Sequence, residues 1–339
     1  MTRRSRRADP VDVLAAADPV AAFFEAHARG ARVALRTSGT SAAPRSVLRT
    51  TDSWVSSFPH LTSLMSIDAG SRIWVPGPLS SSMNLFASVH ACSVRADLVH
   101  RPELATHAHL TPTALLRALD HGTELGGAHV VVAGGQLSRP LSERAGAAGI
   151  RVSHYYGAAE LSFVAWGSHE ADLQPFPQVE VVVREGVLWV RSPYLCEGYA
   201  GLSGSLRTEG DGYATVGDRG WFTQGHLVVS GRGTAVVTTA GATVHVADVE
   251  GVLRPAVEGE VVVVGVPHAE LGEVLAAVLT DALSFQRARA IARGTLAPAQ
   301  QPRLWFEVRH LPLTSAGKVD RSTLAALLTA NEGSTRRLT

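Results

Sequence analysis

Residues 129–133 read His-Val-Val-Val-Ala, an almost unbroken apolar run that leads directly into Gly134-Gly135-Gln136. A strand without a polar face has to be covered on both sides, which is typical of a strand inside a parallel sheet. Parallel strands need long crossover connections, which are usually helices. The run therefore predicts an α/β fold with helices on both faces of a sheet.

The flanking sequence repeats a strand–helix–strand rhythm, which supports the α/β class. An amphipathic segment from Pro10 to Gly30 predicts one or two short helices. Thr111-Pro112 begins a helix that ends at His121-Gly122. Further strands are expected at Val33–Leu35, Val47–Arg49, Ile73–Val75 and Arg151–Tyr155, and further helices from Thr51, over Leu79–Ala91 and over Arg139–Gly149.

The pattern changes after residue 178. Val179–Val183 and Val187–Val190 flank the turn Arg184-Glu185-Gly186 and predict an antiparallel hairpin, and short strands continue to Ser230. A domain boundary is expected at Gly231–Thr234. Beyond it, strands are expected at Ala235–Thr238, Val261–Val264 and Trp305–Val308, and helices at Val246–Leu253, Ser284–Arg293 and Arg321–Thr329.

Composition excludes several classes of protein. The chain has 339 residues, of which 45% are hydrophobic and 18% charged, the profile of a soluble globular protein of about two domains. Because 31 basic residues balance 30 acidic ones, electrostatics gives no case for a nucleic-acid or membrane partner. The basic start Arg3–Arg7 is either an arm for an anionic partner or a solvated terminus, and no apolar signal core follows it. We expect a cytoplasmic protein.

Cysteine and histidine do not indicate a metal site. Cys92 and Cys196 are far apart and lack metal-ligand spacing, so we interpret both as core fillers. The 14 histidines include no His-x3-His or His-Glu-x2-His pair, which makes a zinc site a poor interpretation.

A run of hydroxyl-bearing and small residues follows the first expected strand. Thr37-Ser38-Gly39-Thr40-Ser41 is closed by Pro44-Arg45. Small residues let backbone N–H groups approach an anion, and the hydroxyls and Arg45 add donors and positive charge. Taken alone, the run is either a phosphate-binding loop or an ordinary Ser/Gly turn, because it does not match Gly-x4-Gly-Lys-Ser/Thr.

Further motifs follow in a fixed order along the chain. They are Tyr156-Gly157-Ala158-Ala159-Glu160, Val216-Gly217-Asp218-Arg219-Gly220, Gly231-Arg232, Val264-Gly265-Val266-Pro267 with Gly272-Glu273, and the segment LPLTSAGKVDR over Leu311–Arg321. Together with the hydroxyl loop, they resemble the adenylate-forming superfamily of acyl-CoA synthetases, peptide-synthetase adenylation domains and luciferases. The resemblance runs from about Val33 to Leu324, and the short o-succinylbenzoate–CoA ligases look most similar.

The resemblance implies a fold and a reaction. Residues 1–233 would form a large core domain, truncated at its N-terminus, with a mostly parallel sheet and an antiparallel β subdomain. Residues 234–339 would form a small, mobile α+β lid domain. In the reaction, a carboxylate attacks the α-phosphate of ATP and gives an acyl-adenylate and pyrophosphate, and a thiol then displaces AMP. The implied cofactors and partners are ATP, Mg²⁺, a small or medium carboxylic acid, and CoA or the phosphopantetheine of an acyl carrier protein.

The resemblance also implies roles for individual residues on the nucleotide. The loop Thr37–Ser41 would hold the β- and γ-phosphates, with Arg45 in place of the usual lysine. Gly134, Gly135 and Gln136 would line the adenine side, and Tyr156, followed by Gly157, would stack on the base. Without the other motifs, the glycines are better explained as a tight turn at a strand end and the tyrosine as a core residue.

Four further residues would carry the chemistry. Glu160 would be the magnesium ligand, since Mg²⁺ prefers hard oxygen donors. Asp218 would accept hydrogen bonds from both ribose hydroxyls, and Arg232 would face the ribose or phosphate. Lys318 would neutralise charge on the carboxylate and α-phosphate. In isolation, each has a simpler interpretation: a carboxylate at a helix N-terminus, a turn residue, a surface arginine and a solvated turn residue.

The chain also departs from the family pattern. It has only about 35 residues before the hydroxyl loop, so much of one sheet layer is expected to be absent or supplied by a partner subunit, which leaves a homodimer open. Ala159 replaces a hydroxyl, and Ser81 falls where a histidine usually borders the acyl pocket. Thr234 stands where the family usually has a hinge Asp or Lys. Thr238 replaces a common Lys, and Val246 replaces a common Pro.

The acid substrate is expected to bind against Leu79–Phe86, Gly134–Leu137 and Phe163–Trp166. Ser80, Ser82 and Asn84, with Ser81, suggest a somewhat polar wall, and Leu79–Phe86 contains no acidic residue to hold an α-amine. A small or medium aliphatic or aromatic acid is therefore expected. The sequence predicts an AMP-forming acid–thiol ligase, and the alternative is a nucleotide-binding or scaffolding homologue without turnover.

Overall fold

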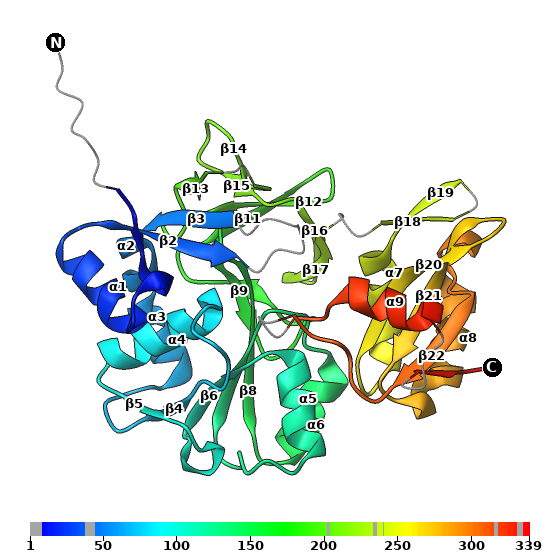
Figure 1. The fold of residues 1–339 in the computed structure, drawn as a ribbon, viewed down its shortest axis with the longest axis horizontal. Helices are drawn as coiled ribbons and strands as arrows, with labels where there is room; N and C mark the ends of the chain where they lie inside the picture. The colour runs from blue at the N-terminus through cyan, green and yellow to red at the C-terminus, as the bar shows by residue number, and fades with distance from the viewer. Residues whose placement is uncertain are drawn as a thin grey trace.

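The computed structural model describes residues 9–37, 45–201, 204–232, 236–239, 241–314, 318–330 and 335–339. In this part of the chain the strands form four sheets. Figure 1 shows three of them in one large body and the fourth in a separate lobe at the carboxyl end. Helices cover the sheets, so the predicted α/β class is confirmed.

The central sheet has seven strands in the order β10-β9-β8-β7-β6-β4-β5. The five strands from β5 to β8 run parallel, while β9 and β10 are antiparallel at one edge. The strands are β4 (Arg72–Trp74), β5 (Asp97–Val99), β6 (His107–Leu110), β7 (His129–Val132), β8 (Arg151–Ala158), β9 (Ser162–Gly167) and β10 (Gln174–Pro175).

Helices cover both faces of the central sheet (Figure 1). Val131 of β7 packs in one apolar cluster with Phe86, while its neighbours Val130 and Val132 pack with Leu115 in another. The predicted strand at residues 129–133, covered on both faces, is therefore confirmed. The helices of this body are α1 (Pro19–Ala28), α2 (Asp52–Val55), α3 (Phe58–Met65), α4 (Ser82–Ser93), α5 (Pro112–Asp120) and α6 (Arg139–Ala147), with short 3-10 turns η1 (Val13–Ala15) and η2 (Pro102–Leu104).

Two smaller sheets complete the large body. One has the order β1-β2-β3-β13 and carries the strands on either side of the hydroxyl loop. The other contains the predicted hairpin, because β11 and β12 pair antiparallel from Glu180 with Arg191 to Arg184 with Val187. Their strands are β1 (Val11–Asp12), β2 (Arg32–Thr37), β3 (Arg45–Thr50), β11 (Glu180–Arg184), β12 (Val187–Arg191), β13 (Gly198–Ala200), β14 (Arg207–Thr208), β15 (Ala214–Thr215), β16 (Asp218–Thr223) and β17 (His226–Arg232).

The C-terminal lobe, described from residue 236 onward, has its own sheet with helices on both faces. Val263 packs toward α7 and α8, whereas its neighbour Val264 packs toward Leu324 of α9. The elements of the lobe are β18 (Val236–Thr239), β19 (Ala242–His245), α7 (Val246–Leu253), η3 (Arg254–Ala256), β20 (Val261–His268), β21 (Gly272–Leu279), η4 (Ala282–Ser284), α8 (Phe285–Thr295), η5 (Pro298–Gln300), β22 (Leu304–Val308), α9 (Arg321–Ala330) and β23 (Thr335–Arg337). The predicted boundary at residues 231–234 stays a prediction, because residues 233–235 lie outside the described residues.

Two expectations from the sequence are corrected. Cys92 is exposed near the end of α4 and Cys196 is only partly buried, so Cys92 is not a core residue. The helix expected from Leu79 begins at Ser82, because residues 78–81 form a turn in which Ser81 N–H donates to the Pro78 carbonyl at 3.0 Å, and Ser81 itself has an extended backbone. No helix in the described ranges combines the length and apolar character that a membrane crossing requires.

Candidate active site

A cavity lies at the carboxyl ends of the parallel strands, where ligands bind in open α/β sheets. β6 and β7 pair in parallel and end at Leu110 and Val132, so Thr111 and Gly134 follow at the same edge of the sheet. Both residues line this cavity, which we call the acid cavity. Serines and aromatic side chains form much of its wall: Ser80, Ser81, Ser82 and Ser162, with Trp54, Phe86, Tyr155 and Phe163.

Lys318 reaches the acid cavity from the C-terminal lobe. Its Cε lies 4.0 Å from the point where a Cβ on Gly134 would stand. The backbone around it is held by a β-bridge between Leu313 and Val319, and Thr314 N–H donates to the Lys318 carbonyl at 2.8 Å. The side chain is exposed, and it belongs to the only lysine in the chain. The structure thus brings together Lys318 and Gly134, two residues predicted for the site.

The turn after β7 is shaped by glycine and fixed by a side chain. Gly134 has a φ of +82°, a left-handed conformation that favours glycine. Gly135 packs against Pro112, with its hypothetical Cβ 3.3 Å from the proline ring. The Gln136 side-chain amide donates to the Val229 carbonyl of β17. This hydrogen bond ties the predicted adenine-side loop to the antiparallel subdomain.

Tyr156 and Asp218, predicted for the base and the ribose, lie in direct contact. The Tyr156 hydroxyl donates to Asp218 Oδ2 at 2.7 Å, and Asp218 is 7% exposed. Asp218 pairs with Arg232 through the backbone of β16 and β17. At Gly157 the ladder between β8 and β9 shifts register, and a Cβ would stand 2.2 Å from the Ser162 carbonyl oxygen, so only glycine fits.

Glu160 lies in the turn between β8 and β9 and not at a helix N-terminus, which removes the simpler interpretation of this carboxylate. It is 7% exposed, and Oε1 accepts a hydrogen bond from the Tyr199 hydroxyl at 2.8 Å. Among the described residues, no three His, Cys, Asp or Glu side chains gather as a metal site. A single carboxylate fits a magnesium ion that takes its other ligands from nucleotide phosphates and water.

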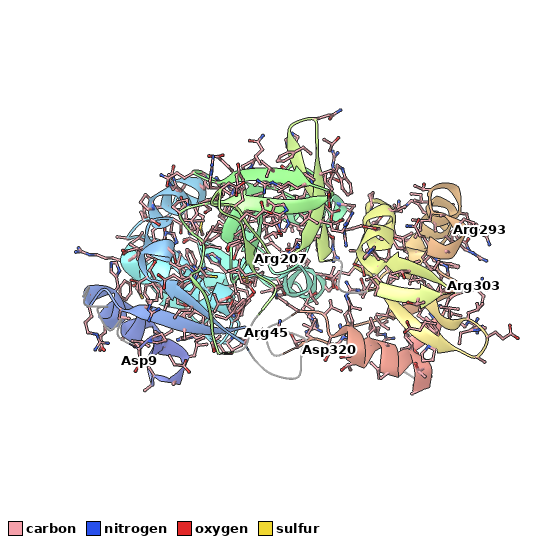
Figure 2. All side chains as sticks on the ribbon, turned by 90° about the horizontal axis from the view of Figure 1, so that it is seen from above. Asp9, Arg45, Arg207, Arg293, Arg303 and Asp320 are labelled. Atoms are coloured by element: carbon pink, nitrogen blue, oxygen red, sulfur yellow. The ribbon has the colours of Figure 1, made fainter. Side chains whose placement is uncertain are left out.

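The hydroxyl loop is described only at its two ends. Thr37, the last residue of β2, pairs with Arg45, the first residue of β3. Ser38, Gly39, Thr40 and Ser41, which were predicted to hold phosphates, lie outside the described residues. In the view of Figure 2, Arg45 and Asp320, two residues after Lys318, both lie in the middle of the molecule where the lobe meets the large body.

A second cavity of about 400 Å³, the inter-lobe cavity, lies beside Gly134–Gln136 and is also lined by Lys318. Besides Lys318, four charged residues of the lobe line it: Glu250, Arg254, Glu260 and Arg321. Arg321 donates to both Glu250 carboxylate oxygens, at 2.5 and 3.0 Å. Burial raises the pKa of Glu260 above its ordinary value, although its hydrogen bond from Thr113 opposes this.

Sequence reasoning missed this charged group. One signal was present: Glu250 follows Val246 and Val249 at helical spacing and precedes Leu253, so it occupies the buried face of α7. A carboxylate on the apolar face of a helix needs a partner. Of the residues expected to line the acid pocket, Ser80–Ser82 and Phe163 do line the acid cavity. Asn84, which was expected in the polar wall, donates to the Pro78 carbonyl.

No family model matches the chain. Among curated proteins, an uncharacterized acyl-CoA ligase of Bacillus subtilis, YhfT, is 26% identical over 323 residues, which cover 84% of this chain and 66% of YhfT. The chain therefore spans about two thirds of that relative's length.

Solved structures share the fold. A variant of Escherichia coli MenE with bound OSB-AMS superposes with a TM-score of 0.72 at 25% identity, covering 88% of this chain and 69% of MenE. ATP-bound MatB from Rhodopseudomonas palustris gives a TM-score of 0.71 at 22% identity, covering 88% of this chain and 68% of MatB. In fold and in sequence, the chain is therefore similar to proteins of the adenylate-forming acyl-CoA ligase superfamily.

Proposed function

We propose that this protein is an AMP-forming acid–thiol ligase. A carboxylate oxygen attacks the α-phosphorus of ATP, the bond to the bridging oxygen breaks, and pyrophosphate leaves. A thiol sulfur then attacks the acyl carbonyl, the thiol loses its proton, and AMP leaves with the bonding electrons. One observation carries the proposal: Lys318, from one lobe, lines the same cavity as Gly134 and the serine-rich wall of the other.

The residues suit these steps. The Lys318 ammonium would offset the negative charge where carboxylate and α-phosphate meet, and a preorganised cation of this kind acts mainly on the transition state. Asp218 would accept hydrogen bonds from the ribose hydroxyls, beside the Tyr156 ring that would stack on adenine. Glu160 would hold Mg²⁺, which shields phosphate charge when bound. Thr37–Ser41 with Arg45 would hold the β- and γ-phosphates, and Arg232 would lie near the ribose.

The acid cavity favours a small acid. Its volume is about 120 Å³, below the roughly 300–1,000 Å³ of typical drug-sized ligand sites. Trp54, Phe86 and Phe163 provide apolar contact, and Ser80–Ser82 provide hydroxyls. An aromatic or short aliphatic acid with a hydrogen-bonding substituent suits this wall. We propose CoA as the thiol, with a carrier-protein phosphopantetheine as the alternative acceptor.

A second candidate function is nucleotide binding without turnover. It is favoured by Ala159, which lines the acid cavity with a methyl group where the family has a hydroxyl. The missing hydroxyl removes one hydrogen bond to phosphate or acyl-adenylate.

Pyrophosphate exchange into ATP across a panel of aromatic and aliphatic acids tests the proposal. Exchange that depends on one class of acid supports the ligase, and reactions without acid provide the control. If ATP raises the melting temperature but no acid supports exchange, turnover is excluded and the second candidate stands.

A further inference from the structure

Arg49 is an unusual residue for the interior of this protein. It lies on β3, has 0% exposure, and follows Val47 on the buried face of the strand. Its Nη2 donates to the Ala159 carbonyl at 2.8 Å, and its guanidinium lies 5.4 Å from the centre of the Trp54 ring. Within the described residues, its Nε and Nη1 have no hydrogen-bond partner.

A buried cation with unmet donors lowers stability compared with an apolar residue of similar size. Stability therefore does not explain Arg49. Burial lowers its pKa to about 10, while the nearby Cys196 and Glu160 act in the opposite direction. Arg49 thus stays charged at neutral pH, and its positive field acts on the turn that carries Glu160.

Tyr199 holds the same turn from a neighbouring strand. Its hydroxyl donates to Glu160 Oε1 at 2.8 Å and accepts from the Leu206 N–H at 3.1 Å. Tyr199 is on β13, where it pairs with Val47 of β3. The backbone adds a further link, since Cys196 N–H donates to the Glu160 carbonyl at 2.8 Å.

We propose that Arg49 and Tyr199 are positioning residues that fix the Glu160 carboxylate for the metal–nucleotide complex. The inference rests on the proposed function. β3 begins at Arg45, directly after the hydroxyl loop, and Arg49 lies four residues further along the strand, on the same face. The two strands β3 and β13 therefore couple the phosphate-binding end of one sheet to the Glu160 turn of another. The Tyr199 hydrogen bond holds Oε1, so Oε2 is the oxygen that would remain for the metal.

The test measures metal binding directly. Mn²⁺, standing in for Mg²⁺, is titrated with α,β-methylene-ATP at saturation, and free Mn²⁺ is followed by electron paramagnetic resonance. We expect Tyr199→Phe to weaken Mn²⁺ binding roughly 10- to 100-fold, the usual effect of losing an outer partner of a metal ligand. Nucleotide binding without metal stays within about twofold, because neither residue is expected to contact the nucleotide.

Tyr213→Phe is the matched control. The Tyr213 hydroxyl donates to Glu180 Oε2 at 3.1 Å, and Glu180 belongs to another sheet. The control variant therefore loses the same kind of hydrogen bond at a place away from the site. For Arg49, the Arg49→Met variant is compared with Arg49→Lys, which keeps the charge and is expected to recover part of the Mn²⁺ affinity. If Arg49→Met does not fold, Tyr199→Phe decides the question alone.

The outcomes separate the two proposals. Unchanged Mn²⁺ affinity in Tyr199→Phe, with or without a lower melting temperature, means that the residue is structural only and overturns the inference. If the wild-type protein binds no Mn²⁺–nucleotide complex, the proposed function itself fails. Weaker Mn²⁺ binding in Tyr199→Phe but not in Tyr213→Phe supports the inference.

Discussion

At the scale of the residue, the chain's use of a single lysine is informative. All its other basic residues are arginines, including Arg45 in the hydroxyl loop. Arginine is a planar fork with fixed donors, whereas lysine is a compact charge on a flexible stem. Lysine suits a position where a compact charge has to reach a cavity from a second lobe. This accounts for a lysine, and not an arginine, at position 318.

We predict that Lys318→Ala lowers pyrophosphate exchange about 100-fold or more, because one preorganised charge donor contributes roughly 3 kcal/mol to transition-state stabilisation. Lys318→Arg should recover only a small part, since the guanidinium is bulkier. Calorimetric ATP affinity should change little in both variants. An Ala variant that exchanges at the wild-type rate would remove Lys318 from the reaction.

Being the only lysine, Lys318 also gives an independent measurement. Acetylation with an amine-selective reagent should modify this side chain and the N-terminal amine, and the extent of modification at Lys318 should match the loss of exchange. Peptide mass spectrometry quantifies acetylation at the two amines separately, so a loss of exchange that follows the terminal amine instead of Lys318 would contradict the prediction.

Gly157 gives a residue-scale prediction about stability. A Cβ at this position would stand 2.2 Å from the Ser162 carbonyl oxygen, so the backbone of the β8–β9 bulge would have to move. We predict that Gly157→Ala lowers the free energy of unfolding by roughly 2 kcal/mol or more, measured in urea. Gly146→Ala is the control: it is inside α6 with nothing within 4 Å of its Cβ, and the change should raise stability by about 0.5–1 kcal/mol.

At the scale of the element, the parallel strands bury a group of histidines. His107 of β6 and His129 of β7 are in register, and both contact the Met65 carbonyl, at 3.0 and 3.2 Å. Burial lowers the pKa of His129 to about 4 and that of His109 to about 3. These rings are neutral in the folded protein at pH 7.

Because the unfolded chain has ordinary histidine pKa values near 6.5, it binds protons at a pH where the folded protein does not. The stabilising effect of the neutral rings is therefore complete above about pH 6.5 and is lost as the pH falls toward 4. We predict that urea unfolding shows a loss of roughly 3 kcal/mol or more between pH 7 and pH 4.5. His109→Leu should reduce the slope, whereas His100→Gln, at an exposed position, should not.

Elements differ in how well the sequence predicts them. β7 is fully buried and its sequence is an almost continuous apolar run, so the local pattern is sufficient to predict the strand. β21 was missed because Val274–Leu279 mixes alanine and leucine, which also suit a helix. Its strand state depends on pairing with β20 and with β22, which begins 25 residues beyond the end of β21.

The candidate site shows the same limit. The order of motifs predicted Lys318, Gly134, Tyr156 and Asp218 as site residues. In the structure, Lys318 and Gly134 line one cavity, and the Tyr156 hydroxyl donates to Asp218. Trp54 was not predicted to line the acid cavity. It is on α2, and its place in the wall depends on how that helix packs against the central sheet, which no local pattern encodes.

At the scale of the whole molecule, a few polar contacts hold the C-terminal lobe in the position that brings Lys318 to the acid cavity. Arg254 pairs with Glu170 at 3.2 Å, and both side chains are largely buried, at 12% and 17% exposure. Thr113 donates to Glu260 at 2.8 Å, and Arg117 donates to the Leu311 carbonyl at 3.2 Å. These contacts join α5 and the end of the central sheet to the lobe.

We predict that Glu170→Gln slows acyl-adenylate formation about tenfold, because loss of a partly buried ion pair weakens this lobe position by roughly 1–2 kcal/mol. Single-turnover quench experiments with ATP and acid measure this step. Transfer of a synthetic acyl-adenylate to CoA should be unaffected if that step uses another lobe position. Glu143→Gln, which removes an exposed pair with Arg139 on α6, is the matched control. Equal slowing of both steps in Glu170→Gln would show that the ion pair stabilises the site in general and does not select the position for adenylation.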